Sequence, residues 1–155
     1  MKLDLEHRAL ALLRGDEGVR THAYDDATGK RVRAPVGHLT IGAGINLDIG
    51  LSSWEIDMLE RHRLHVHVST FTVEVATAYS ITMGNLPDDV QVGLALMCFQ
   101  LGWEGTLEFH NMLRDIAKGH WELAAVEAKH SKWKVETPKR ADEVAKLFLY
   151  ADPKK

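Results

Sequence analysis

Cysteine is nearly absent from this sequence. The single cysteine, Cys98, excludes a disulfide within the chain. Its apolar neighbours Leu96, Met97 and Phe99 predict a buried, unreactive thiol rather than a nucleophile. No apolar run approaches the roughly 20 residues that a membrane-spanning helix needs, so we expect no membrane insertion. The first residues mix acids and bases at helical spacing and lack an apolar signal core, so we expect no signal peptide.

A basic excess is also missing. The net charge is -3, whereas a dedicated nucleic-acid-binding domain usually carries a clear positive charge. We therefore expect no nucleic-acid partner, although residues 108–155 are mildly basic. The 155 residues are 45% apolar and 26% charged, and they contain no internal repeat. These values exclude a disordered or collagen-like chain and predict one ordinary globular domain.

Turn-forming residues gather in the stretch of roughly residues 22–48. Four glycines and one proline fall there, namely Gly29, Gly37, Gly42, Gly44 and Pro35. Such a cluster of glycine and proline is typical of turns and short strands rather than of helix. Residues 22–48 are therefore the candidate for a small β-lobe.

Helical periodicity covers most of the remaining sequence. Ser52 followed by Glu55 forms a capping-box pattern at the start of the longest segment, and the β-branched residues near Thr70 favour a break within it. The expected helices span residues 3–14, 52–80, 87–102, 106–118, 120–130 and 138–150. The predicted fold class is α+β and mostly helical, with a ligand-binding cleft between the β-lobe and the helices.

Acidic side chains that could act in catalysis lie just before and within the predicted β-lobe. Glu17 follows the end of the first helix, and Asp25 and Asp26 fall in a turn-like stretch. Glycoside hydrolysis needs two carboxylates across a cleft, one to protonate the leaving oxygen and one to activate water or attack the sugar. Taken alone, this spacing favours the simpler interpretation of one surface acid and two turn acids without a catalytic role.

The sequence from Glu17 onward resembles the phage-type lysozymes, or endolysins, of glycoside hydrolase family 24. The matching features are EG-x-R from Glu17, Tyr24 and Asp26 before Gly29, and TIG-x-G from Thr40. Three later stretches match in the right order, namely LPDDVQVGLALMCFQLG, FHNMLRDIAKGHWELAA and SKWKVETPKRADEVAKLF. The resemblance runs from about residue 10 to about residue 148.

This resemblance implies a single lysozyme-like domain over residues 1–155. Its small N-terminal β-lobe would cover about residues 16–48, and a long connecting helix would cover about residues 52–80. The larger helical lobe would cover about residues 85–150 together with the N-terminal helix.

The resemblance also implies catalytic roles. Glu17 would be the general acid, Asp26 would orient or activate water, and Thr40 would help to position that water. The family inverts the anomeric centre, so the two carboxylates should leave room for a water between them. Arg140 would hold Glu17 in place; because a nearby cation lowers a carboxyl pKa, the acid role also needs burial. Asp25 remains an alternative to Asp26.

Substrate-binding positions follow from the same resemblance. Phe99 and Gln100 match the floor and wall of the cleft, and Lys132 and Thr137 match its far edge. Trp103, which follows a predicted helix end, is the best candidate among the four tryptophans for stacking on a sugar. Packing in the core or at its rim is the competing interpretation for each tryptophan.

The sequence departs from the family pattern in three ways. The loop between Asp26 and Thr40 is longer than usual, so spacing alone does not place Thr40 beside Asp26. Ile45 and Asn46 replace a His-Leu pair, which removes a buried histidine ion pair. The net charge is acidic, which predicts weaker long-range attraction to an anionic wall.

The expected function is that of a muramidase which cleaves the β-1,4 bond between N-acetylmuramic acid and N-acetylglucosamine in bacterial peptidoglycan. We expect no cofactor and a monomer. The protein would accumulate in the host cytoplasm and reach the wall through a holin or within a virion. The alternatives are a non-catalytic wall-binding or virion structural module, a chitin-acting glycosidase and a lytic transglycosylase.

Histidines invite a metal hypothesis. His62 and His65 lie one helical turn apart, but His67 falls off that face, and no cysteine or close acid accompanies them. We therefore expect no metal site.

Overall fold

The computed structural model describes residues 2–17, 19–25, 28, 30–33 and 37–151, without the side chains of Asp16 and Glu17. The chain is mostly helical with one small antiparallel sheet, as the predicted α+β class requires. The helices are α1 (Leu3–Glu17), α2 (Ser53–Tyr79), η1 (Met83–Asn85), α3 (Asp88–Leu107), α4 (His110–Ala117), α5 (Trp121–Lys129), α6 (Lys132–Glu136) and α7 (Pro138–Leu149). The strands are β1 (Thr40–Ile41) and β2 (Ile45–Asn46).

The long helix α2 begins where the sequence predicts. The Ser52 hydroxyl accepts from the backbone N–H of Glu55, and the Glu55 carboxylate accepts from the backbone N–H of Ser52, which completes the capping box. The expected break near Thr70 is wrong, because α2 continues unbroken to Tyr79. The hydroxyl of Thr70 donates to the carbonyl of Val66, so this β-branched side chain is accommodated within the helix.

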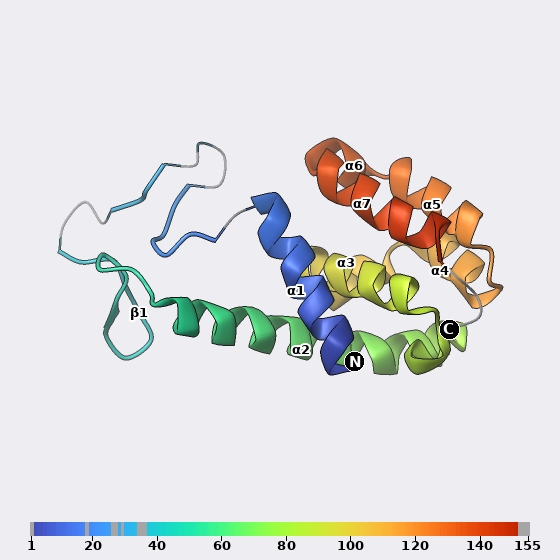
Figure 1. Cartoon of the computed structure of the whole chain (residues 1–155), viewed down its shortest axis with the longest axis horizontal. Helices are drawn as coiled ribbons and strands as arrows, with labels where there is room; N and C mark the ends of the chain where they lie inside the picture. Colours follow the sequence, from blue (N-terminus) through green and yellow to red (C-terminus); the bar gives the residue numbers. More distant parts are fainter. Residues whose placement is uncertain (1, 18, 26–27, 29, 34–36, 152–155) are drawn as a thin grey trace.

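Helix α3 is the centre of the core. It packs against α1, α2 and α7 (Figure 1), and every side chain from Val90 to Cys98 is buried. Gly93 permits a close approach to α7, because a Cβ there would lie 2.6 Å from the ring of Phe148. Gly102 has φ 74° and ψ 169°, so it interrupts the helix as expected. The chain then resumes a helical conformation and continues to Leu107.

Three helix boundaries differ from the prediction, and one short helix was not expected. α1 passes through Gly15 and ends at Glu17, whereas the sequence suggested an end at Gly15. Pro87 caps α3 instead of lying in its first turn. α4 begins at His110, not at residue 106, because Thr106 and Leu107 belong to α3. The short helix α6, capped by the Ser131 hydroxyl, was not expected.

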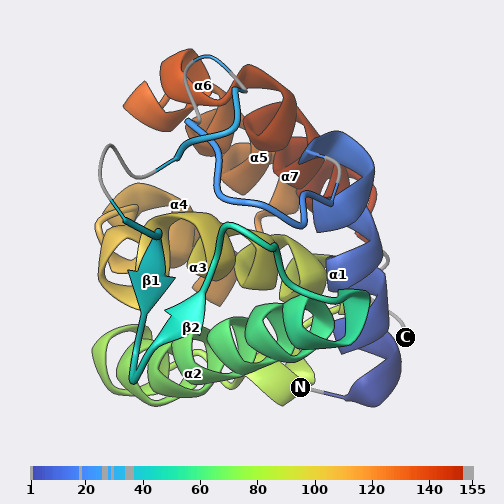
Figure 2. The ribbon, with the colours of Figure 1, turned by 90° about the vertical axis from the view of Figure 1, so that its left-hand side faces the viewer.

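The sheet is a short hairpin, in which Thr40 pairs with Asn46 and Ile41 pairs with Ile45. Gly42 and Gly44 have positive φ values in its turn, as the predicted glycine-rich turn requires. The hairpin stands at the N-terminal end of α2, apart from helices α4–α7 (Figure 1), and Figure 2 views it from the front. Among the described residues, no helix is long and apolar enough to cross a membrane.

Candidate active site

The end of α1 lies against α7 at Arg140. This arginine is only 3% exposed, and its Nη2 atom is 3.5 Å from the carbonyl oxygen of Leu13, four residues before the helix ends at Glu17. Its Nη1 atom donates to Glu143 at 2.9 Å. The side chain of Glu17 lies outside the described residues. The backbone therefore places Arg140 beside the last turns of the helix that carries Glu17.

The turn expected around Asp25 is present. The carboxylate of Asp25 accepts from the backbone N–H of Thr28 at 3.1 Å, and its own N–H donates to the carbonyl of Lys30. Asp25 is exposed. Asp26 falls in a part of the chain that the structure leaves undescribed, so Asp25 stays an alternative to it.

Thr40 opens the hairpin as the first residue of β1 and is exposed. Its hydroxyl donates to the carbonyl of His38 at 3.1 Å. Asp48 braces this segment, because its Oδ2 atom lies 3.1 Å from Nδ1 of His38 and accepts from the backbone N–H of Leu39 at 3.3 Å. Polar bonds thus fix the backbone that carries Thr40.

Two of the predicted substrate-binding residues meet at a buried tryptophan. Trp133 is 3% exposed and donates from Nε1 to the Gln100 side-chain oxygen at 3.3 Å. The hydroxyl of Thr137 donates to the carbonyl of Trp133 at 3.2 Å. Thr137 occupies the cap position of α7 but makes no side-chain cap bond there. The structure thus brings Gln100 and Thr137 together around the start of α7.

The two aromatic candidates on α3 lie at the edge of the core. Phe99 and Trp103 are half-buried and pack against the buried cluster. Trp103 directly follows the interruption at Gly102. This packing fits the rim interpretation of the tryptophan, and its stacking on a sugar stays a prediction.

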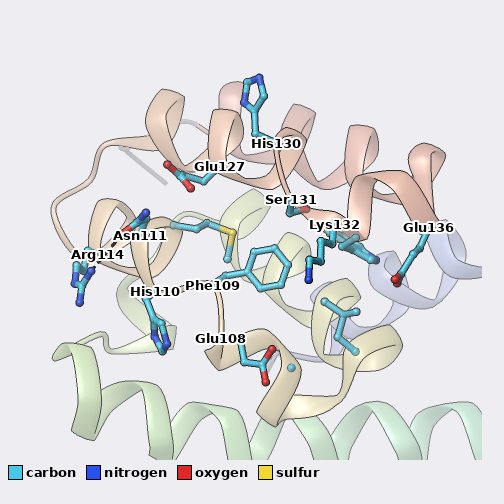
Figure 3. A pocket seen from close by; sticks show the side chains of 14 residues that line it. Glu108, Phe109, His110, Asn111, Arg114, Glu127, His130, Ser131, Lys132 and Glu136 are labelled. Carbon is cyan, nitrogen blue, oxygen red and sulfur yellow. Dashed lines mark hydrogen bonds between the residues drawn. The ribbon is translucent and has the colours of Figure 1, made fainter.

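A pocket of about 550 Å³ lies between the end of α3 and helices α4, α5 and α6 (Figure 3). Lys132 is the predicted substrate-binding residue that lines it. The other labelled side chains in Figure 3 are Glu108, Phe109, His110, Asn111, Arg114, Glu127, His130, Ser131 and Glu136. Sequence reasoning missed all of these as a group.

The pocket carries both signs of charge. Arg114 and Lys132 supply cations, while Glu108, Glu127 and Glu136 supply carboxylates. Such a lining can bind a ligand that bears both amino and carboxyl groups. The sequence feature that could have indicated this pocket is the strongly amphipathic pattern of α4, which buries one face of the helix and leaves polar side chains to line the pocket.

Two smaller expectations concern Cys98 and the histidines. Cys98 is buried, and burial raises the pKa of its thiol to about 12 despite an opposing hydrogen bond with Thr106. The predicted burial of this thiol is confirmed, and a buried thiol with a raised pKa is a poor nucleophile. Across the described residues, no group of three or more histidine, cysteine or acidic side chains is arranged to hold a metal ion.

Comparison with known proteins extends these observations. No family model matches the chain. The chain is 27% identical to a probable T4-type lysozyme 2 of Dictyostelium discoideum, over 88% of this chain and 91% of that protein. A probable T4-type lysozyme 1 of the same organism is 28% identical over the same shares. The pre-baseplate central spike protein Gp5 of Enterobacteria phage T4 is 25% identical over 89% of this chain, but the match covers 27% of Gp5.

These three matches each cover almost nine tenths of the chain, which no isolated motif would do. Two of them carry the T4-type lysozyme name, and the third is a phage protein. The resemblance of this chain to the phage-type lysozymes of the T4 kind is therefore confirmed.

Proposed function

We propose that this protein is a muramidase that hydrolyses the β-1,4 bond between N-acetylmuramic acid and N-acetylglucosamine in peptidoglycan. The observation that carries the proposal is the similarity to T4-type lysozymes over 88% of the chain. The geometry supports it, because α1 ends at Glu17 and Arg140 lies against the same end of the helix.

In the proposed mechanism, Glu17 protonates the glycosidic oxygen while Asp26 activates a water on the opposite face of the sugar. Thr40 orients that water from the first position of β1. The C1–O bond breaks as the C1–OH bond forms, and the configuration at C1 inverts. Arg140 acts as a positioning residue, since a buried guanidinium beside the helix end restricts where Glu17 can lie.

The proposed architecture is two lobes within residues 1–155. The β-lobe covers about residues 16–48, the connecting helix about residues 52–80, and the helical lobe about residues 85–150 with α1. Glycan would bind along Phe99 and Gln100.

The mixed-charge pocket suits a second part of the same polymer. The glycan strands of peptidoglycan carry short peptides with both carboxyl and amino groups. Arg114 and Lys132 offer partners for the former, and Glu127 offers one for the latter. Thr137 and Lys132 would lie at the edge where glycan and peptide diverge.

The test compares reducing-end release from purified peptidoglycan by three proteins: the wild type, Glu17→Gln and the control Glu74→Gln. Glu74 is an exposed glutamate on α2, so its loss should leave the rate unchanged. Glu17→Gln removes the acidic proton without changing shape, and we expect at least a hundredfold loss, in line with general acid catalysis worth about 10²–10⁴-fold. A fully active Glu17→Gln variant would overturn the assignment.

A second candidate function is favoured by the match to Gp5, whose name describes a central spike protein of the pre-baseplate. This chain would then be a virion-associated module, active or purely wall-binding. Sedimentation with peptidoglycan without any new reducing ends would support the non-catalytic form. A free endolysin would accumulate in the host cytoplasm and need a holin to reach the wall.

A further inference from the structure

The first three turns of α2 and the remainder of this helix are held to the rest of the protein by different forces. The buried side chains of this helix are Leu64, Val68, Phe71 and Val75, so burial begins only at its twelfth residue. Residues 53–63 are all described, and none of their side chains is buried. The first three turns of α2, which lead from the hairpin, therefore contain no buried apolar side chain.

Charged side chains connect these first three turns to α1. Arg14 of α1 donates from Nε to Glu60 at 2.8 Å and from Nη2 to Asp57 at 2.6 Å. Asp57 also accepts from Arg61 at 2.7 Å, and Arg61 reaches back to Glu6 of α1 at 2.7 Å. Two arginines and three carboxylates thus link α1 to α2 along a continuous chain, which we call the α1–α2 ionic network.

The side chains of this network are 22–34% exposed, so water and salt reach them only in part. The pKa of Asp57 is lowered to about 2 by its hydrogen bonds to Arg61 and Arg14, so the carboxylate stays charged over the working range of pH. Each contact is a charge-assisted hydrogen bond of 2.6–2.8 Å.

The position of Arg14 gives the network a functional consequence. Arg14 lies three residues before Glu17 in α1, within the last turn of the helix. A helix is rigid over one turn, so whatever fixes Arg14 also fixes the backbone at Glu17. Arg140 contacts Leu13 from α7, whereas Arg14 reaches α2, so the end of α1 is held by two different helices.

We propose that Arg14, through Asp57 and Glu60, is a positioning residue that holds the end of α1 at a fixed place relative to α2 and the hairpin. This inference rests on the proposed function, in which Glu17 on α1 and Thr40 on the hairpin act on one bond. Arg14 itself touches no substrate; it sets the distance between the two catalytic segments.

The first experiment is kinetic and compares Arg14→Gln with Arg8→Gln. Arg8 is a matched control, because it lies on the same helix and forms an ion pair with Asp89 of α3 at 2.5 Å, where buried apolar side chains already hold the two helices together. Arg14→Gln should lower kcat about tenfold to a hundredfold with little change in KM, the loss expected of a small misplacement. Arg14→Lys, which keeps the charge and one contact, should recover part of kcat. Arg8→Gln should match the wild type.

The second experiment measures geometry without any substrate. Spin labels at Ala43→Cys in the hairpin turn and Lys129→Cys at the end of α5 report the distance between the hairpin and the helices. Both sites are exposed, and the native Cys98 is buried and does not compete for label. We expect a narrow distance distribution that broadens in Arg14→Gln and not in Arg8→Gln. Asp57→Asn provides a second route should Arg14→Gln fail to fold.

The outcomes separate the two hypotheses. An inactive wild type with a broadened distribution in Arg14→Gln would overturn the proposed function and support the positioning role. Full activity and an unchanged distribution in both Arg14→Gln and Asp57→Asn would overturn the positioning role. Equal loss of kcat in Arg8→Gln and Arg14→Gln would overturn it too, because the effect would then be one of general stability.

Discussion

Two regions of this molecule are built on different physical principles. From Met83 to Ala151 the chain forms a close-packed helical core, with Leu94, Leu113 and Phe148 fully buried. In the described residues of 19–63, in contrast, no side chain is buried, and hydrogen bonds and ion pairs hold the backbone. The helices therefore supply most of the stability, while the polar region carries exposed polar side chains such as Thr40.

That division has an energetic basis. Burying an aliphatic or aromatic side chain stabilises a fold by about 1.5–3 kcal/mol, whereas an exposed ion pair contributes about 0–1 kcal/mol. A region without buried side chains therefore rests on contacts that open at low cost. We expect the described segment from residue 37 to residue 51 to open locally long before the helices unfold.

The largest effect is expected in the helical region. Phe148→Ala removes a fully buried ring that packs against Gly93 and should lower the free energy of unfolding by about 3–5 kcal/mol. Thermal or urea denaturation followed by circular dichroism measures the loss. A change below 1 kcal/mol would contradict the view that this core carries the stability.

A smaller effect in the same region comes from overpacking. In Gly93→Ala the new methyl group would lie 2.6 Å from the Phe148 ring, so α3 and α7 must separate slightly. We expect a loss of about 1–3 kcal/mol. The double variant Gly93→Ala/Phe148→Leu, in which the smaller side chain relieves the clash, should lose less than the sum of the two single variants. Additive losses would show that the two residues do not interact.

Asp48→Ala probes the polar region. The substitution removes the carboxylate that contacts the His38 ring and accepts from the backbone N–H of Leu39. His38 is exposed and Leu39 is half-buried, so water can replace the lost contacts. Global stability should change by less than about 1 kcal/mol, while the amide protons of Leu39 and Leu47 should exchange faster with solvent. Unchanged exchange at these amides would show that Asp48 does not brace the hairpin.

The smallest effect is a pH dependence at the junction of the two regions. The pKa of Asp57 is lowered from 3.8 to about 2 by Arg61 and Arg14, so its contribution is complete above the unfolded value and disappears as pH falls through about 2. The difference in Tm between wild type and Asp57→Asn should therefore shrink between pH 5 and pH 2. A constant difference would contradict the assigned pKa.

Local sequence rules predicted the elements whose signals are self-contained. The capping box of Ser52 and Glu55 and the glycine turn before Ile45 both appear where the pattern placed them. The rules failed at the end of α1. Gly15 was expected to end α1, but this helix continues to Glu17.

The candidate site divides in the same way. Family motifs led to Arg140, and the structure places it beside the end of α1. They led to Lys132 as well, but not to the pocket around it, because its lining comes from four helices whose meeting no local pattern reveals. The side chain of Glu17 and the whole of Asp26 lie beyond the described part of the chain, so their roles stay predictions.

We propose that this chain hydrolyses the glycan of peptidoglycan through Glu17. The most direct test is mass spectrometry of the soluble fragments released from purified peptidoglycan by the wild type and by Glu17→Gln. We expect the wild type alone to release disaccharide fragments that have gained one water and end in reducing N-acetylmuramic acid. Fragments with an anhydro end, or identical fragments from both proteins, would contradict it.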